Sequence, residues 1–230
     1  WIAENPPGVG TGWEPYPVSL RIVNWVKFAL SGGMLDATAH HSLAIQVRWL
    51  MKRLEWHLLG NHLLANAKAL LFAGLYFDGP EADRWRRRAV SILLREMPEQ
   101  FLPDGGQFEL TPMYHALAVE DVADIVNLTT VFGAVLDSAE TRLARTCTNR
   151  LPEMLCWLDA MSHPDGRISF FNDAAFGVAP ENDRLHDYAA RLGLDTQTLP
   201  NTGLLHLSDS GFARMARGEA VVLCDIGRIG

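Results

Sequence analysis

Apolar residues recur at helical spacing over most of residues 17–161. The residues Leu43, Val47, Leu50, Leu54 and Leu58, for example, would lie on a single face of an α-helix. Proline, glycine and capping residues interrupt the pattern at intervals. It therefore predicts six helices, at about 17–31, 36–58, 61–77, 80–97, 111–136 and 138–161, and a shorter one at about 181–192.

The pattern changes after residue 161. Ile168–Phe171 is short and strand-like, and residues 204–230 alternate like antiparallel strands around Gly211 and Gly218. The first sixteen residues, rich in Gly, Pro and Trp, predict an extended lead-in. Long helices joined by short turns exclude a doubly wound α/β fold and favour a bundle, solenoid or toroid. The sequence thus predicts a mainly α chain of antiparallel helix pairs that ends in the first strands of a β domain.

Composition limits the partners of the chain. A net charge of -7 argues against a nucleic-acid-binding protein, because such binding needs a concentrated basic surface. An acidic ligand remains compatible, since 20 Lys and Arg residues are enough to line a cleft. The three cysteines are widely spaced without a CxxC pattern, so neither a disulfide framework nor a zinc site is predicted. The apolar stretch 65–77 contains Asn66 and Lys68 and is too short to span a membrane, so no membrane insertion is predicted.

Four stretches of the sequence, in matching order and spacing, resemble the heparinase II/III-like family. They are 13–25 (WEPYPVSLRIVNW), 60–66 (GNHLLAN), 109–115 (ELTPMYH) and 171–175 (FNDAA). Proteins of this family have an incomplete α/α toroid followed by an antiparallel β-sandwich, and an acidic polysaccharide binds between the two. The resemblance implies that residues 1–200 are the later part of the toroid and residues 201–230 the first strands of the sandwich.

The ends of the chain are consistent with a part of a longer protein. Trp1 follows no initiator Met, and Gly230 comes soon after the strand-like run 220–224. The resemblance further implies a polysaccharide lyase that acts by β-elimination on heparan sulfate or another uronic-acid-containing polymer. We expect it to be bacterial and periplasmic or secreted. No cofactor is implied, and a metal in the remainder of the β domain is left open.

The resemblance also nominates catalytic residues. In these lyases an Asn of the toroid contacts the uronate carboxylate and a Tyr transfers protons, and Asn61 and Tyr114 occupy the matching positions. In alginate-lyase relatives the His directly after this Asn also takes part, which His62 matches. A further His from the β domain would lie beyond Gly230. Residues 1–230 alone are therefore not expected to turn over substrate.

The expected chemistry explains these residue types. Removing the C5 proton of a uronate requires that the adjacent carboxylate be neutralised. An amide such as Asn61 can donate to one carboxylate oxygen, and the free N–H groups at the start of its helix add positive potential. A tyrosine can serve as the base near C5 or as the acid near the O4 leaving group, and its partner is His62 or the β-domain His rather than His115, which points along another direction of its helix. Which group is the base and which the acid stays open.

Other residues are candidates for substrate binding, because aromatic faces stack on sugar rings and arginine pairs with carboxylate or sulfate. They are Trp13, Tyr16, Arg21 and Asn24, with Glu109, His115, Asn172 and Asp173 from the later stretches. The alternative is that the aromatic residues pack between helices, that Arg21 makes a structural salt bridge and that Asn172 organises a turn. The arginines at 84, 86, 87 and 88 are expected on a solvated helix face, with Trp85 turned inward.

Two other functions stay open at this point. α/α toroids also host glycoside hydrolases, which need two carboxylates at the scissile bond, and Glu109 and Asp173 are the candidates. That reading leaves Asn61 and Tyr114 without a role. The other alternative is a non-catalytic carbohydrate-binding scaffold, against which the presence of Asn61 and Tyr114 weighs.

Overall fold

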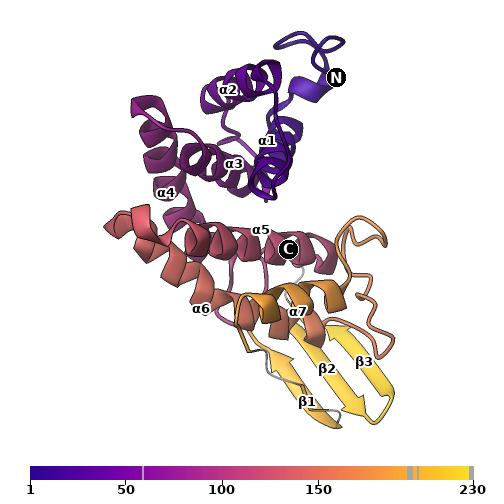
Figure 1. The fold of residues 1–230 in the computed structure, drawn as a ribbon. Helices are drawn as coiled ribbons and strands as arrows, with labels where there is room; N and C mark the ends of the chain where they lie inside the picture. Colours follow the sequence, from indigo (N-terminus) through magenta and orange to yellow (C-terminus); the bar gives the residue numbers. More distant parts are fainter. Residues whose placement is uncertain (59, 196–198, 201, 228–230) are drawn as a thin grey trace. The chain divides into compact units, whose positions relative to one another are not determined.

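The computed structural model describes residues 1–58, 60–195, 199–200 and 202–227. Within them the chain forms seven α-helices followed by a three-stranded antiparallel sheet (Figure 1). Their bounds are α1 (Pro15–Leu30), α2 (Ala37–Met51), α3 (His62–Tyr76), α4 (Pro80–Gln100), α5 (Pro112–Val131), α6 (Ser138–Ala160), α7 (Asn182–Arg191), β1 (Thr202–Leu207), β2 (Phe212–Arg217) and β3 (Ala220–Asp225). The chain divides into two compact units, Trp1–Glu96 and Met97–Gly230, and each is described by itself.

The first unit is built around α3. α1 packs along α3, and α2 contacts both helices. Every residue of α3 from Leu63 to Leu75 is buried, which explains why this helix is apolar on all sides. α1 instead buries one stripe, which includes Val18, Ile22 and Val26. The helices of this unit therefore form one core with α3 at its centre.

α2 ends at Met51, whereas the apolar spacing predicted a helix to about residue 58. Asp36 caps its start as expected, since its side chain accepts a backbone N–H at 2.7 Å. The segment after Met51 is held by tertiary contacts instead. The side-chain oxygen of Asn66 accepts the backbone N–H of Glu55 at 2.9 Å. Leu54 is still buried, so its apolar position reflects burial of a loop and not continuation of the helix.

In the second unit α5 and α6 pack along each other, and α7 contacts both. α5 ends at Val131, earlier than predicted, and a short 3-10 turn follows at Gly133–Val135. A capping box of Asp137 and Glu140 then starts α6. α7 is attached through His186, whose Nε2–H donates to Asp159 of α6 at 2.8 Å, and this bond raises the pKa of His186.

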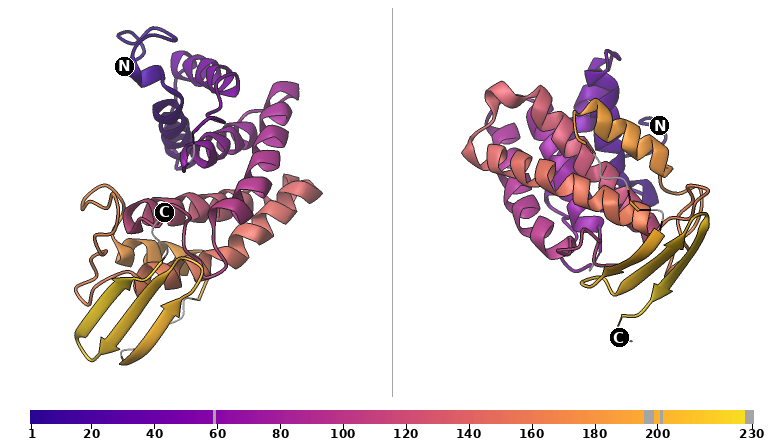
Figure 2. Two further views of the ribbon diagram at one scale, coloured as in Figure 1. Left: turned by 180° about the vertical axis from the view of Figure 1, so that it is seen from behind. Right: turned by 90° about the horizontal axis from the view of Figure 1, so that it is seen from below.

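The sheet confirms the predicted alternation in the described part of residues 204–230. Its order is β1–β2–β3, and both pairings are antiparallel, as two further views show (Figure 2). One face of the sheet packs on the end of α6. The buried residues of this contact are Trp157, Ala160, Met161, Leu207 and Phe212. This cluster joins the sheet to the helices of the second unit.

The turn between α4 and α5 also holds the sheet. Oδ2 of Asp104 accepts the backbone N–H and the hydroxyl of Ser210 at 2.7 and 2.8 Å. The hydroxyl oxygen of Ser210 in turn accepts the indole N–H of Trp157 at 2.9 Å. Gly105 has φ of 93°, and a side chain there would collide with the backbone of Glu153. The turn therefore has one defined path, which leads into the start of α5.

Two predicted local features differ from the structure. Ile168–Phe171 does not form a strand; within the described residues it makes a single bridge, from Ile168 to Ser162. Phe171 packs on Phe212, with ring centroids 5.0 Å apart. The lead-in is not extended, since it contains the 3-10 turn Thr11–Trp13, and α1 starts at Pro15. Residues 201 and 228–230 of the predicted β region lie outside the described residues, and the predicted domain boundary at residue 200 stays a prediction. No helix in the described part of the chain is both long and apolar enough to cross a membrane.

Candidate functional site

Three of the predicted site residues meet at the start of α3. Asn61 precedes the helix and is buried, with 7% of its surface exposed. Its side chain makes no hydrogen bond to the first turn of α3, so the amide is not used as a helix cap. His62 is the first helical residue, and the centroid of its ring lies 4.6 Å from that of Tyr16 in α1. The first unit thus places Tyr16 against His62, the residue next to Asn61.

A buried carboxylate stands behind His62, and sequence reasoning missed it. Glu55 is 6% exposed, and its Oε1 lies 3.1 Å from Nδ1 of His62. The side-chain N–H₂ of Asn66 donates to Oε2 of Glu55 and to the hydroxyl of Ser19, each at 3.0 Å. Asn66 closes the same short motif that contains Asn61 and His62, which is the one sequence signal for this network. Glu55 itself lies in the part of the predicted helix 36–58 that follows Met51, where the structure has a loop instead.

The network fixes the orientation of the His62 ring. A carboxylate accepts hydrogen bonds, so the N–H of this pair is on Nδ1 of His62, and in the neutral ring the lone pair is then on Nε2. The side chain of His62 is 37% exposed, against 8% for that of Glu55, so the anchor is buried while the imidazole is reachable. An imidazole held in one tautomer can accept or return a proton without first reorienting. The N–H groups in the first turn of α3 add positive potential beside it.

Tyr114 lies in the first turn of α5, in the second unit. Thr111 precedes the helix and Pro112 opens it, as the sequence predicted. The residue is partly exposed, and within the described residues its hydroxyl has no hydrogen-bond partner. A phenol in this position can give or take a proton without breaking an existing bond. This placement is compatible with the predicted role in proton transfer.

His115, next to Tyr114, is fully buried. Its Nε2–H donates to the carbonyl of Met154 at 2.8 Å, and Nδ1 accepts the backbone N–H of Gln107 at 3.1 Å. Burial lowers the pKa of His115 to about 4, so the ring is neutral at physiological pH. Its ring also packs against Trp157 at a centroid distance of 4.4 Å. These contacts give His115 a structural role, and its predicted contact with substrate finds no support in them.

Asn172 is tied to Leu110 at the surface of the second unit. Nδ2 of Asn172 donates to the carbonyl of Leu110 at 2.8 Å. Both residues have positive φ, 53° and 56°, a strained conformation for side chains other than glycine. They line one side of a hollow of about 830 Å³, whose other walls come from the β1–β2 turn and the end of β3. Asn172 therefore organises a turn, as the alternative reading predicted, at the edge of an open surface.

The two carboxylates of the hydrolase alternative have different surroundings. Glu109 exchanges two hydrogen bonds with Gln107: its carboxylate accepts from Nε2 and its backbone N–H donates to Oε1, both at 2.9 Å. Asp173 is exposed. Holding the loop in place is thus a sufficient role for Glu109. Within the described residues, no group of three or more His, Cys, Asp or Glu is arranged to hold a metal ion.

Trp13 packs inside the first unit. It is 3% exposed, and its ring centroid lies 5.7 Å from that of Trp49 and 6.0 Å from that of Trp1. The small part of Trp13 that reaches the surface lines a hollow of about 370 Å³ together with Trp49 and Arg53. Most of the Trp13 side chain is therefore used in packing, as the alternative interpretation predicted. Sugar stacking on it stays a prediction.

Arg21 is held by neutral partners. Its Nε donates to the side-chain oxygen of Gln46 at 2.7 Å, and one terminal N–H₂ donates to the carbonyl of Gly12 at 2.8 Å. Burial lowers the pKa of Arg21 to about 10, so it is a cation at neutral pH. The structural salt bridge of the alternative reading is not formed with any described carboxylate. Asn24, one turn further along α1, is exposed.

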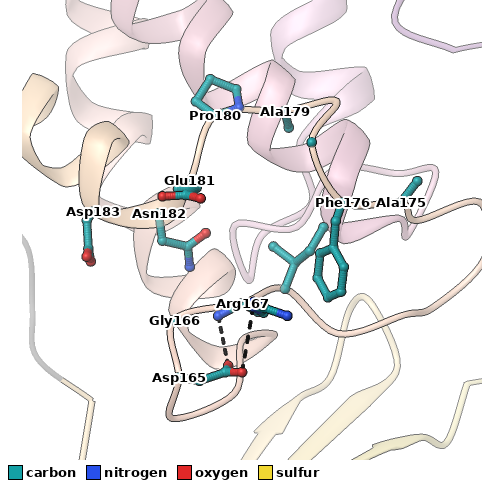
Figure 3. Close-up of a pocket in the computed structure, with 12 residues that line it drawn as sticks. Asp165, Gly166, Arg167, Ala175, Phe176, Ala179, Pro180, Glu181, Asn182 and Asp183 are labelled. Carbon is teal, nitrogen blue, oxygen red and sulfur yellow. Dashed lines mark hydrogen bonds and ion pairs between the residues drawn. The ribbon is translucent and has the colours of Figure 1, made fainter.

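Another hollow, of about 350 Å³, lies between the 165–168 turn and the start of α7 (Figure 3). None of the predicted site residues lines it. Its ionisable residues are Asp165, Arg167, Glu181 and Asp183, and both the backbone N–H and the guanidinium of Arg167 already face Asp165. Three carboxylates against one cation repel an acidic ligand. We therefore do not place a glycan site there.

The chain is similar to two curated heparin-sulfate lyases. That of Bacteroides stercoris is 33% identical over 116 residues, which are 50% of this chain and 17% of the relative. That of Pedobacter heparinus is 27% identical over 206 residues, which are 83% of this chain and 29% of the relative. The chain thus spans less than a third of the length of these curated relatives.

Solved structures show the same fold. A crystal structure of heparinase III superposes with a TM-score of 0.73 at 19% identity, covering 98% of this chain and 39% of that one. The heparan sulfate lyase HepC from Pedobacter heparinus gives a TM-score of 0.61 at 22% identity, covering 97% of this chain and 38% of that one. Together with the order of elements, this likeness confirms the predicted fold class, the helices of a partial α/α toroid followed by antiparallel strands.

The family itself is shown by a sequence model described as Heparinase II/III N-terminus, which matches residues 1–190. All four stretches that carried the predicted resemblance lie inside this match. Because the match covers most of the chain, the resemblance is confirmed, and the chain belongs to the heparinase II/III N-terminus family.

Proposed function

We propose that the whole protein is a polysaccharide lyase that cleaves a uronic-acid-containing polysaccharide, heparin-like, heparan sulfate-like or another acidic glycan, by β-elimination. The name of both curated relatives, heparin-sulfate lyase, supports the reaction class and an acidic glycan substrate. The observation that carries the proposal for this chain is the His62 ring, anchored by buried Glu55 directly beside Asn61. Elimination needs a carboxylate contact and a proton-transfer group next to each other, and this pair offers both.

Asn61 is the proposed contact to the uronate carboxylate. When the C5 proton leaves, negative charge builds up on that carboxylate as an enolate-like group. A fixed amide donor and the helix N–H groups behind it stabilise this charge more strongly in the transition state than in the ground state. Because Asn61 does not cap its own helix, serving a ligand costs α3 no capping bond.

Tyr114 and His62 are the proposed proton-transfer groups. In one arrangement, one of the two residues removes the C5 proton and the other protonates the O4 leaving group. In the other arrangement, Tyr114 performs both steps from one side of the sugar. The tautomer imposed by Glu55 leaves the lone pair of His62 on Nε2, which suits it to accept a proton. Tyr114→Phe removes one of these two groups, and Glu55→Gln loosens the anchor of the other.

We further propose that the protein is bacterial and acts in the periplasm or outside the cell. A charged polymer does not cross a lipid bilayer unaided, because every carboxylate and sulfate would have to leave water. An enzyme that cleaves the intact polymer therefore works outside the cytoplasm. Fractionation of the native host, followed by detection of the protein, tests this: recovery in the cytoplasmic fraction alone contradicts it.

The reaction type is tested by the products of the whole protein. β-Elimination leaves a C4–C5 double bond conjugated to the carboxylate, so digestion of heparan sulfate or a related uronate polymer should raise ultraviolet absorbance in step with new reducing ends. Hydrolysis instead adds water across the bond and gives reducing ends without that absorbance. The second outcome would favour the hydrolase alternative, and no cleavage of any uronate polymer would favour a binding scaffold.

We expect Glu55→Gln to lower kcat of the whole protein roughly ten- to a hundredfold with little change in KM. Gln keeps the size of the side chain but has one acceptor oxygen where Glu55 uses two, so it can accept from Asn66 or from His62 but not from both. If the oxygen stays with Asn66, the amide N–H₂ faces His62 and the ring loses its anchor. Steady-state kinetics on a uronate polymer measure both constants. A change in KM with kcat unchanged would contradict the positioning role.

Glu140→Gln is the matched control. Glu140 is also a buried glutamate, 2% exposed, but it belongs to the capping box of α6 in the second unit. Its replacement should cost about 1 kcal/mol of stability through the weakened cap and leave kcat unchanged. A similar fall in kcat for both variants would assign the Glu55 effect to general destabilisation.

A further inference from the structure

The arginine run of α4 forms an ordered stripe on the first unit. Trp85 is 4% exposed and turned inward, as the sequence predicted, while Arg84, Arg88 and Arg95 are exposed. Their spacing of four and seven residues puts all three on one face of the helix. At 1.5 Å per residue the stripe extends about 16 Å along the helix axis. The cations are therefore arranged in a line and not scattered around the helix.

An exposed tryptophan completes this stripe. Trp56 precedes α3 in the loop after α2 and is 43% exposed. The guanidinium carbons of Arg88 and Arg95 each lie 4.8 Å from its ring centroid. Stacking on an aromatic ring orders a guanidinium while its N–H edges stay open to an anion. Trp56 thus holds two of the three arginines in a fixed orientation.

The charge of the stripe is only partly compensated. Arg84 and Arg88 make no ion pair within 4.0 Å of a described carboxylate, although Arg84 is close enough to Glu81 to help lower the pKa of that carboxyl. Arg95 contacts the neighbouring Glu96 at 2.6 Å. Glu96 is buried against Arg95 and offsets the charge of that arginine, so Arg84 and Arg88 carry the uncompensated charge of the stripe. In a chain with a net charge of -7, a line of arginines on one face is a local exception to the overall charge. Such a surface attracts a polyanion while the rest of the molecule repels it.

We propose that Trp56, Arg84, Arg88 and Arg95 form a binding surface for an acidic polysaccharide, separate from the residues at the start of α3. The proposal rests on the proposed function for the class of ligand, since the polymer that supplies the substrate also supplies the anionic chain. Regularly spaced sulfates or carboxylates match a line of guanidinium groups. Arg84 and Arg88 can each bind one anion through two N–H bonds, whereas Nε and one terminal nitrogen of Arg95 already donate to Glu96. The surface holds a long polymer near the protein and contributes little to short substrates.

The test compares Arg84→Gln/Arg88→Gln with Arg142→Gln/Arg145→Gln in the whole protein. Arg142 and Arg145 are exposed on α6 and likewise make no ion pair with a described carboxylate, so both variants lose the same charge without breaking a salt bridge. Binding to heparin is measured as the salt concentration that elutes the protein from an immobilised heparin column, and as Kd against salt. We expect the α4 variant to bind roughly tenfold more weakly at low salt, with a salt slope smaller by about two, and the α6 variant to be close to unmodified.

Trp56→Ala separates ordering from charge. It leaves all arginines in place but removes the ring on which two of them stack, so heparin binding should weaken by a smaller factor than in the arginine variant. Circular dichroism and thermal unfolding verify that each variant is folded. Equal losses for the α4 and α6 variants, or no loss for either, overturn the proposal, because heparin would then respond only to net charge or bind elsewhere.

Two further outcomes are informative. Tighter binding of the unmodified protein to single-stranded DNA than to heparin at the same salt overturns the choice of ligand. Retention on heparin that depends on the α4 arginines, in a protein that cleaves no uronate polymer, refutes the proposed lyase function and leaves this surface standing. If the protein cleaves a uronate polymer but the α4 variant is retained on heparin as strongly as the unmodified protein, the lyase function stands and the binding surface is refuted.

Discussion

Tyr114→Phe is expected to lower kcat of the whole protein on its uronate polymer about a thousandfold, with much less change in KM. The substitution deletes one oxygen and keeps the ring, so binding surfaces that use the ring survive. General acid–base groups typically contribute a factor of 10² to 10⁴, which sets the expected size of the loss. Because the hydroxyl has no partner among the described residues, its removal leaves no buried group unpaired, and the unfolding free energy should change by less than about 0.5 kcal/mol.

Tyr188→Phe supplies the matched control in the same unit. The Tyr188 hydroxyl donates to buried Asp124 at 3.0 Å and accepts from Asn127 at 3.0 Å. Its loss should therefore cost about 1–3 kcal/mol of stability and leave kcat near the parental value. The two variants thus predict opposite patterns, one catalytic and one structural. A folded Tyr114→Phe protein that keeps near-parental turnover would place this tyrosine in the packing and end the assignment.

Local signals in the sequence were sufficient for the order of the helices and of the strands at the end of the described chain. The cap at Asp36, the proline at Pro112 and the turn glycines at Gly211 and Gly218 mark boundaries through their own backbone preferences, so their effect needs no tertiary information. The end of α2 could not be predicted in this way. Its apolar spacing continued past Met51, but the loop is fixed by a side chain that follows eleven residues after Glu55.

The candidate site shows the same division. The motifs place Asn61, His62 and Tyr114 at helix starts, and the structure has them there. They could not reveal Glu55 behind His62, since the sequence predicted the two residues in separate helices, 36–58 and 61–77, and gave no relative orientation for them. Nor could they show that His115 is buried with both ring nitrogens occupied, because burial depends on what packs against the helix.

Asn61→Ala is expected to lower kcat about a hundredfold and to raise KM for uronate polymers as well. The proposed contact exists in the ground state and strengthens as charge develops, so its removal affects both binding and turnover. Loss of one donor to a developing oxyanion typically costs a factor of 10² to 10³. Asn149→Ala, at an exposed position of α6, is a control that should leave both constants unchanged. If Asn61→Ala alters only thermal stability, the residue is structural.

Asn61→Asp best distinguishes a structural role of Asn61 from a contact to the uronate carboxylate. The first role predicts retained activity on uronate polymers, and the second predicts a loss. The free N–H groups at the start of α3 attract a negative charge, so Asp should be tolerated at this position with no loss of activity if Asn61 does not contact the substrate. A carboxylate at this position cannot donate to the uronate carboxylate and repels it at close range. We therefore expect Asn61→Asp to retain or raise the unfolding temperature relative to Asn61→Ala while binding and cleaving uronate polymers less well. Kinetics and thermal unfolding of the Ala and Asp variants side by side decide the matter: activity in the Asp variant at or above that of the Ala variant would rule out Asn61 as the carboxylate contact.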